Sequence, residues 1–322
     1  MLDSMKKQEA RERIEKLKNE INHHRYLYHV LDRQEISDAA LDSLKNELVK
    51  LERQFPELLT PDSPSQRVGG APLGAFTKVP HALPMLSLED AFSQDDMIAW
   101  EERIRKVYPR GAHGYFAELK IDGFAISLEY ENGVLKRAST RGDGRVGEDV
   151  TENIKTIEAV PLTLQNPAFI MKEARNRLTI VQNEKIMKIL NARIRKGNIE
   201  VRGEVFMAKK VFESINRERT AHDEPLYANP RNTAAGSIRQ LDPKVAASRK
   251  LDFLAYDLAT NLGQRTHAEK HEILSVLGFR TDAYARACEM LDDVYALYQD
   301  VEAKREKLPH HIDGIVVSVN DT

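Results

Sequence analysis

The dipeptide Asn132-Gly133 constrains the fold of this chain most, because it joins two segments that both have the character of β-strands. Residues 124–130 and 134–140 are rich in apolar, aromatic and β-branched side chains. Asn-Gly favours a tight two-residue turn in which both residues take positive φ, so the two segments must pair antiparallel. A further strand-like segment, residues 115–121, comes directly before them. We therefore predict an antiparallel sheet at the centre of the chain.

The other segments alternate between strand-like and helical patterns, so the predicted fold class is α+β. Ser93 with Asp96 resembles a capping box that opens a helix reaching to about Tyr108. Further strands are expected at residues 199–207, 251–258 and 312–319, and further helices at 209–218, 268–277 and 289–307.

The first sixty or so residues carry apolar side chains at intervals of three and four, which predicts a pair of helices. The apolar positions are Ile14, Leu17, Ile21 and Tyr28, then Leu41, Leu44, Leu48, Leu51 and Phe55. Prolines and glycines between residues 56 and 74 interrupt every regular pattern and mark a boundary. We expect a small helical domain at residues 1–70 and a larger one at 71–322.

Composition limits the possible classes of function. The sequence has no apolar run of membrane-spanning length and begins with charged residues, so a cytoplasmic protein is expected. Its one cysteine, Cys288, excludes an internal disulfide and a cysteine-cluster zinc site. The net charge of −2 provides no overall attraction to nucleic acid, so any DNA binding must come from local basic surfaces.

Residues 142–147 match the G-x-G-x-x-G pattern of dinucleotide-binding Rossmann folds, which would suggest an NAD-dependent oxidoreductase. That fold requires a parallel βαβ unit, whereas the strand before these glycines is the second arm of a hairpin. Arg141 also stands where a Rossmann strand would be apolar. A loop that carries an arginine to a phosphate or ribose is the better interpretation.

Lys120 lies in the segment Glu118-Leu119-Lys120-Ile121-Asp122-Gly123, among apolar neighbours and between two carboxylates. A lysine amine titrates near ~10.4 in water, and partial burial with a suitable local field can lower that value. The free amine is a nucleophile for phosphorus or carbonyl carbon. The alternative is an exposed turn after a strand.

Three further segments follow Lys120 in an order that resembles the covalent nucleotidyltransferases. They are residues 141–144 (Arg-Gly-Asp-Gly), 200–205 (Glu-Val-Arg-Gly-Glu-Val) and 312–317 (Ile-Asp-Gly-Ile-Val-Val). Residues 229–241 are nearly the long signature of bacterial NAD-dependent DNA ligases, and residues 85–88 and 140–144 resemble that family too. The resemblance runs from about Tyr26 to the C-terminus, apart from an insert at residues 167–197.

The resemblance implies that residues 1–70 are a helical cap that binds nicotinamide mononucleotide and residues 71–322 an adenylation domain. Lys120 would attack the α-phosphate of NAD, release nicotinamide mononucleotide and hold AMP, the first step in sealing nicks during DNA replication and repair. Asp122 and Glu204 would lie near the ribose and a Mg²⁺ ion, supported by Asp313. Full-length relatives continue into zinc and DNA-encircling modules, so a truncated chain without zinc is expected.

In the same family, Glu118 would accept a hydrogen bond from the adenine amino group, Tyr256 would stack on the ring, and Arg141 would contact sugar or phosphate. Simpler alternatives are a half-buried strand residue for Tyr256 and a pairing with a surface lysine for Glu118. The remaining nucleotide contacts implied are Ser87, Leu88, Leu119 and Ser318, and in the cap Tyr28, His29, Asp38 and Asp42.

The DNA partner implied by the resemblance is a nicked duplex, which this chain would hold weakly as a monomer in the bacterial cytoplasm, near the nucleoid. Arg231, Arg239 and Arg305 match arginines that reach the DNA backbone, where contacts position without reading sequence. They could instead be helix-surface charges.

The chain departs from the family pattern in three places. Leu41 replaces a tyrosine expected against nicotinamide and fits the apolar stripe instead, and Ser318 replaces a lysine expected to contact phosphate. The insert at 167–197 looks helical and carries eight basic and two acidic residues, as a solvated elaboration or as an added contact to DNA phosphates. A degenerate relative that binds NAD or DNA with little catalysis is therefore the alternative function.

Overall fold

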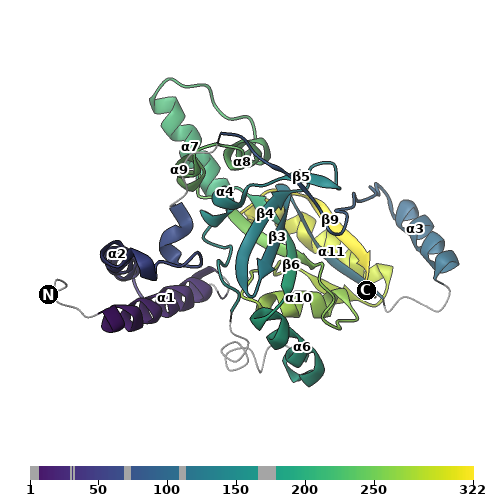
Figure 1. Ribbon diagram of the computed structural model, residues 1–322. Helices are drawn as coiled ribbons and strands as arrows, with labels where there is room; N and C mark the ends of the chain where they lie inside the picture. The colour runs from purple at the N-terminus through teal and green to yellow at the C-terminus, as the bar shows by residue number, and fades with distance from the viewer. Residues whose placement is uncertain (1–6, 30, 32, 69–73, 109–113, 166–178) are drawn as a thin grey trace.

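The computed structural model describes residues 7–29, 31, 33–68, 74–108, 114–165 and 179–322 (Figure 1). Two helices at the N-terminus are followed by antiparallel sheets with helices around them, so the predicted α+β class is confirmed. None of the helices in these ranges is long and apolar enough to cross a membrane.

The N-terminal helices are α1 (Lys7–His29) and α2 (Asp38–Gln54), which pack against each other as the periodicity predicts. Ile14, Leu17 and Ile21 of α1 form a small core with residues of α2. Leu41 packs at the edge of this core, which agrees with its place in the apolar stripe. The short helices η1 (Pro56–Leu58) and η2 (Pro64–Val68) then lead to the larger part of the chain.

The main sheet has four antiparallel strands in the order β4-β3-β6-β7. They are β3 (Phe124–Glu131), β4 (Val134–Thr140), β6 (Asn198–Phe206) and β7 (Asp252–Leu258). Asn132 and Gly133 have φ values of 53° and 80°, as expected for the turn between β3 and β4. Strand β4, which precedes the glycines at residues 142–147, is therefore the second arm of an antiparallel hairpin and not part of a Rossmann βαβ unit.

A second sheet has the order β8-β2-β9, and a two-stranded ribbon pairs β1 with β5. Their bounds are β2 (Tyr115–Ile121), β8 (Arg286–Cys288), β9 (Ile312–Val319), β1 (Lys78–Pro80) and β5 (Val146–Glu148). The sequence did not indicate β1, β5 and β8, which are too short to show a period.

Helices surround the sheets (Figure 1). Those expected from the sequence are α3 (Gln94–Val107), α6 (Glu184–Arg195) in the insert, α7 (Lys209–Ala221), α10 (His267–Val276) and α11 (Leu291–Lys304) with η4 (Arg305–Lys307). The others are α4 (Thr151–Lys155), η3 (Thr179–Gln182), α8 (Pro230–Ile238) and α9 (Pro243–Ser248). The second sheet packs with α11 around a core of its own, separate from the core of the main sheet.

The N-terminal helices are joined to the main core by apolar and ionic contacts. Tyr26 and Leu27, near the end of α1, belong to the main core. Arg67 is buried and donates to the carbonyl oxygens of Ile157 and Val160, both at 2.8 Å. Glu158 pairs with Arg25 at 2.6 Å, and although burial opposes it, the two arginines lower the pKa of Glu158 to about 2.

The described part of the insert contains α6, which buries Ile186, Met187 and Leu190 against the main core. Its basic residues, from Lys185 to Lys196, are exposed. Residues 166–178 lie outside the described residues, so the helical prediction is confirmed only for the second half of the insert.

Candidate active site

Lys120 is the penultimate residue of β2 and faces Asp313 on β9. The amine Nζ lies 2.8 Å from Asp313 Oδ2, and 35% of the lysine side chain is exposed. In the register of the two strands, Lys120 is opposite Gly314 and Ile121 is opposite Ile312, so Asp313 is the extra residue of a β-bulge. A bulge re-aims a side chain, and this one directs the carboxylate to the lysine.

Lys120 borders two cavities. One, of about 870 Å³, is lined from both sheets, and its volume suits a nucleotide. The predicted site residues among its lining are Ser87, Leu88, Glu118, Lys120, Arg141, Glu204, Arg231, Arg239, Tyr256 and Ser318. The other, of about 910 Å³, lies between α3 and α11 and is also lined by Asp313. Lys120 is thus directed to a nucleotide-sized hollow and is no exposed turn residue.

The close approach of β6 to position 123 explains why the segment that contains Lys120 ends in a glycine. A Cβ at this position would lie 2.3 Å from the carbonyl oxygen of Val205 and 2.8 Å from Glu204 Cγ, so another side chain would push β6 away. The close approach brings Glu204 into the same cleft as Lys120.

Glu204 is half-buried, and burial raises its pKa to about 8. Arg231, Lys120 and Arg141 oppose this rise, while Asp122 adds to it. The ionised form of Glu204 therefore depends on the cations around it.

Arg231 extends from α8, whose N-terminus is capped by Asn229. Its Nη1 atom lies 3.6 Å from Asp122 Oδ1 and 3.7 Å from Asp313 Oδ2. The structure therefore turns Arg231, for which a DNA contact was expected, toward two acidic residues. Of these, Asp313 lines the cavity of about 910 Å³, and Asp122 lines neither cavity. Arg239 lines the same cavity and pairs with Glu148 at 3.0 Å.

Arg305 differs from these two arginines, because its Nη2 atom donates to the carbonyl oxygen of Ile312 at 2.7 Å. It holds the start of β9 in this structure, so the expectation of a DNA contact for Arg305 gains no support from its position.

Glu118 and Tyr256 both line the cavity of about 870 Å³. Tyr256 is the extra residue of a second bulge, since Arg202 is opposite Asp257 and Gly203 is opposite Ala255. Burial raises the pKa of the Tyr256 hydroxyl, and Glu204 adds to this.

Leu119 was expected to contact the cofactor, but its side chain is buried in the core of the second sheet and lies in the lining of neither cavity. This corrects the expectation for the Leu119 side chain, because alternate residues of a strand face opposite sides. Its backbone N–H donates to Asp282 Oδ2 at 2.7 Å.

Arg202 is a cavity residue that sequence reasoning missed. Its guanidinium donates to the carbonyl oxygens of Leu83, at 2.5 Å, and Pro84, at 3.0 Å, and so holds the segment that presents Ser87 and Leu88. The signal was present in the alternation of β6, which places Arg202 on the same face as Glu204. Apart from Arg202, His267 of α10 also lines the cavity without having been expected.

Two profiles of known protein families match this chain. The profile of the NAD-dependent DNA ligase adenylation domain matches residues 73–192 and 174–322. A profile of the N-terminal NAD⁺-binding domain of DNA ligase-like proteins matches residues 7–69. The chain belongs to the NAD-dependent DNA ligase family.

Curated relatives named DNA ligase match almost all of the chain. That of Anoxybacillus flavithermus is 46% identical over 314 residues, which cover 97% of this chain and 42% of the relative. That of Carboxydothermus hydrogenoformans is 45% identical over 318 residues, 98% of this chain and 44% of the relative. The ligase of Bacillus subtilis is 43% identical over 318 residues, 98% of this chain and 43% of the relative. The chain thus spans less than half the length of these ligases.

The cap of this ligase-family chain stands apart from the cavities. Tyr28 is 50% exposed, and Asp42 is exposed and lies 3.8 Å from Lys45. The side chains of His29 and Asp38 lie outside the described residues. None of the described residues of the cap lines either cavity. The structure therefore does not bring the predicted nicotinamide contacts to Lys120.

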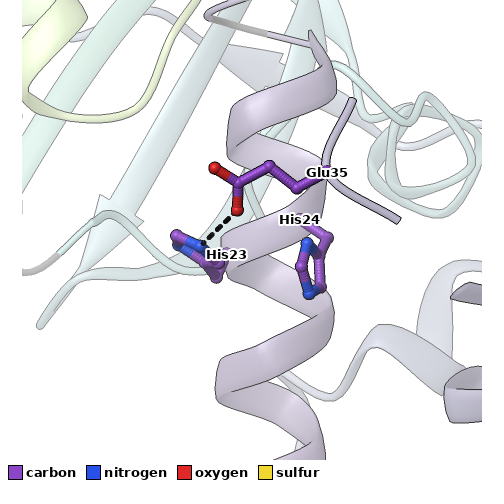
Figure 2. Close-up of side chains that lie close together, drawn as sticks. All are labelled: His23, His24 and Glu35. Carbon is purple, nitrogen blue, oxygen red and sulfur yellow. Dashed lines mark ion pairs between the residues drawn. The ribbon is translucent and has the colours of Figure 1, made fainter. Parts of the chain in front are cut away.

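Figure 2 shows His23, His24 and Glu35 of the cap, whose possible ligand atoms all lie within 4.8 Å of one another. His23 Nε2 is 3.8 Å from Glu35 Oε2, and Arg33 pairs with the same carboxylate. These contacts tie the loop before α2 to α1. The arginine cation already shares the carboxylate, which disfavours a metal ion there.

Proposed function

We propose that this chain carries out the first step of DNA ligation, in which Lys120 takes AMP from NAD. The observation that carries the proposal is the position of the Lys120 amine between Asp313 and a cavity of about 870 Å³. The adenylation-domain profile over residues 73–322 supports it.

In the proposed step, the neutral Lys120 amine attacks the α-phosphorus of NAD. A phosphorus–nitrogen bond forms, the bond from that phosphorus to the oxygen of nicotinamide mononucleotide breaks, and the mononucleotide leaves with the bonding electrons. Asp313, at 2.8 Å, is placed to accept the proton that the amine loses. Arg141 and Arg231 would balance charge on the phosphoryl oxygens.

Mg²⁺ fits this site because Asp122 and Glu204 offer carboxylate oxygens, the donors that Mg²⁺ prefers. When bound, the ion would compensate charge on the phosphate. Arg231 lies 3.6 Å from Asp122, so its side chain would have to move away or share the Asp122 carboxylate with the ion.

The roles expected for the domains and for DNA remain part of the proposal. Residues 1–70 would bind the nicotinamide end through Tyr28, His29, Asp38 and Asp42, after moving toward the cleft. Nicked duplex DNA would be the partner, held weakly by Arg231 and Arg239 in a monomeric protein of the bacterial cytoplasm. A contribution of the exposed basic side chains of α6 would appear as a steeper salt dependence of that binding.

Mass spectrometry after incubation with NAD and Mg²⁺ tests the proposal. We expect an adduct with the mass of one adenylyl group on Lys120 and none in Lys120→Ala. The replacements Leu41 and Ser318 favour the alternative, a degenerate relative that binds NAD without reacting. NAD binding without an adduct would support that alternative, and a change in nicotinamide absorbance would indicate an oxidoreductase.

A further inference from the structure

His271 of α10 contacts Glu118 but is not part of the lining of the cavity. Its Nε2 atom is 3.3 Å from Glu118 Oε2, and the two side chains are 9% and 13% exposed. Glu118 lines the cavity of about 870 Å³, whereas His271 does not. The histidine therefore reaches a carboxylate that faces the cavity without reaching a ligand in it.

The ring of His271 is held in place by aromatic packing. Phe116 is buried, and its ring centroid lies 4.5 Å from that of His271 and 6.1 Å from that of His267. Phe116 is also the cross-strand partner of Ser318, which stands where the ligase resemblance expects a lysine. At this end of the cavity the lining includes His267 of α10 and Ser318 of β9.

The charges around Glu118 compete. Burial raises the pKa of Glu118, His271 lowers it, and Asp282 and Asp257 add to the rise. Asp282 accepts from the N–H of Leu119, and Asp257 is paired with a lysine of α10. Burial lowers the pKa of His267 to about 4, so that ring is neutral at pH 7. Burial keeps the pKa of Glu118 above its usual range, and of the neighbours named here His271 favours the ionised carboxylate.

The protonation state of the Glu118 carboxylate decides which base it can recognise. An ionised carboxylate only accepts hydrogen bonds, whereas a protonated one can also donate. Adenine offers an amino donor at C6, and hypoxanthine offers a carbonyl acceptor at the same position. We propose that His271 is a positioning residue that keeps Glu118 a hydrogen-bond acceptor and so makes the cavity select adenine over hypoxanthine nucleotides. This rests on the proposed function, in which Glu118 faces the base.

Equilibrium binding of AMP and IMP to the full chain, measured by calorimetry, tests the inference without requiring chemistry. We expect the wild-type protein to prefer AMP by about tenfold or more. His271→Leu should lower this preference by about tenfold, mainly through tighter IMP binding. His271→Gln, which keeps a polar side chain, should shift the preference in the same direction and serves if the leucine variant does not fold.

Two further variants separate this role from a general loss of structure. Ile273→Val removes packing of the same helix in the main core, to which Ile273 belongs, and should leave the AMP preference unchanged. In a Glu118→Gln background, His271→Leu should change nothing more, because the carboxylate through which it acts is gone. Raising the pH should restore the AMP preference of His271→Leu, since Glu118 then ionises without its partner.

The same preference should appear in the rates of adduct formation from NAD and from nicotinamide hypoxanthine dinucleotide. An unchanged AMP-to-IMP ratio in the folded His271 variants, or failure of the wild-type protein to bind either nucleotide, overturns the inference. A shifted ratio without any adduct on Lys120 keeps the inference and rejects the proposed adenylation, so the two can fail separately.

Discussion

The Lys120 amine is 2.8 Å from the Asp313 carboxylate, although 193 residues separate the two in the chain. The contact exists because β2 and β9 pair antiparallel and a bulge at Asp313 turns its side chain toward the lysine. One strand pairing therefore brings together the proposed nucleophile, Lys120, and the proposed acceptor of its proton, Asp313.

Asp313→Asn should slow formation of the lysine–AMP adduct by about 10²-fold or more, because the amide cannot accept the proton of the attacking amine. Single-turnover incubation with NAD measures the rate. Asp300→Asn is the matched control, since Asp300 also pairs with a lysine, Lys304, but on the surface of α11. Equal rates for Asp313→Asn and the wild-type protein would remove Asp313 from the mechanism.

Glu204→Gln should abolish or strongly reduce adduct formation while making the protein more stable near pH 8. Burial raises the pKa of Glu204 in the folded chain to about 8, from its ordinary value of 4.5. The folded state thus binds a proton that the unfolded state releases, and stability is lost as pH rises from about 4.5 to about 8. Removing the charge should recover at most about 3 kcal/mol at pH 7. Denaturant unfolding at pH 5 and pH 8 measures this, and a stabilisation equal at both pH values would contradict the explanation.

Ser318→Lys should accelerate adduct formation, because it adds a cation to the cavity in which we propose that a phosphoryl group is transferred. A charge-assisted contact of this kind contributes about 2 to 4 kcal/mol to transition-state binding, or roughly 30- to 1000-fold in rate. Ser318→Gln adds a long side chain without the charge and is the control. If the lysine and glutamine variants react at the same rate, the serine does not limit the reaction.

Gly203→Ala should destabilise the main sheet by about 1 to 3 kcal/mol. Its Cβ would lie 2.2 Å from the Phe253 ring and 2.4 Å from the carbonyl oxygen of Leu254. Gly236, within α8, has no atom within 4 Å of such a Cβ, so Gly236→Ala should stabilise by up to about 1 kcal/mol. Urea unfolding of the two variants checks the opposite signs.

Most of the regular elements could be predicted because their signals are local. The residue types Asn132-Gly133 are sufficient to predict the turn. The strands β2, β4 and β9 have the predicted bounds. By contrast, α8 lies in the ligase signature at residues 229–241, whose small and polar residues show little helical period. The short strand β8 depends on pairing with β2, which no local pattern reveals.

The sequence by itself determined the antiparallel centre of the fold, the family, and the residue types of the cleft, since turn preference, periodicity and motif order are written in neighbouring residues. Only the tertiary structure decided which side chains meet. It turned Asp313 and Tyr256 into the cleft through bulges, directed Arg231 to the acidic residues, hid the Leu119 side chain, and set His271 against Glu118. These contacts join residues far apart in the chain, and burial and charge act on them only after the strands and helices have packed.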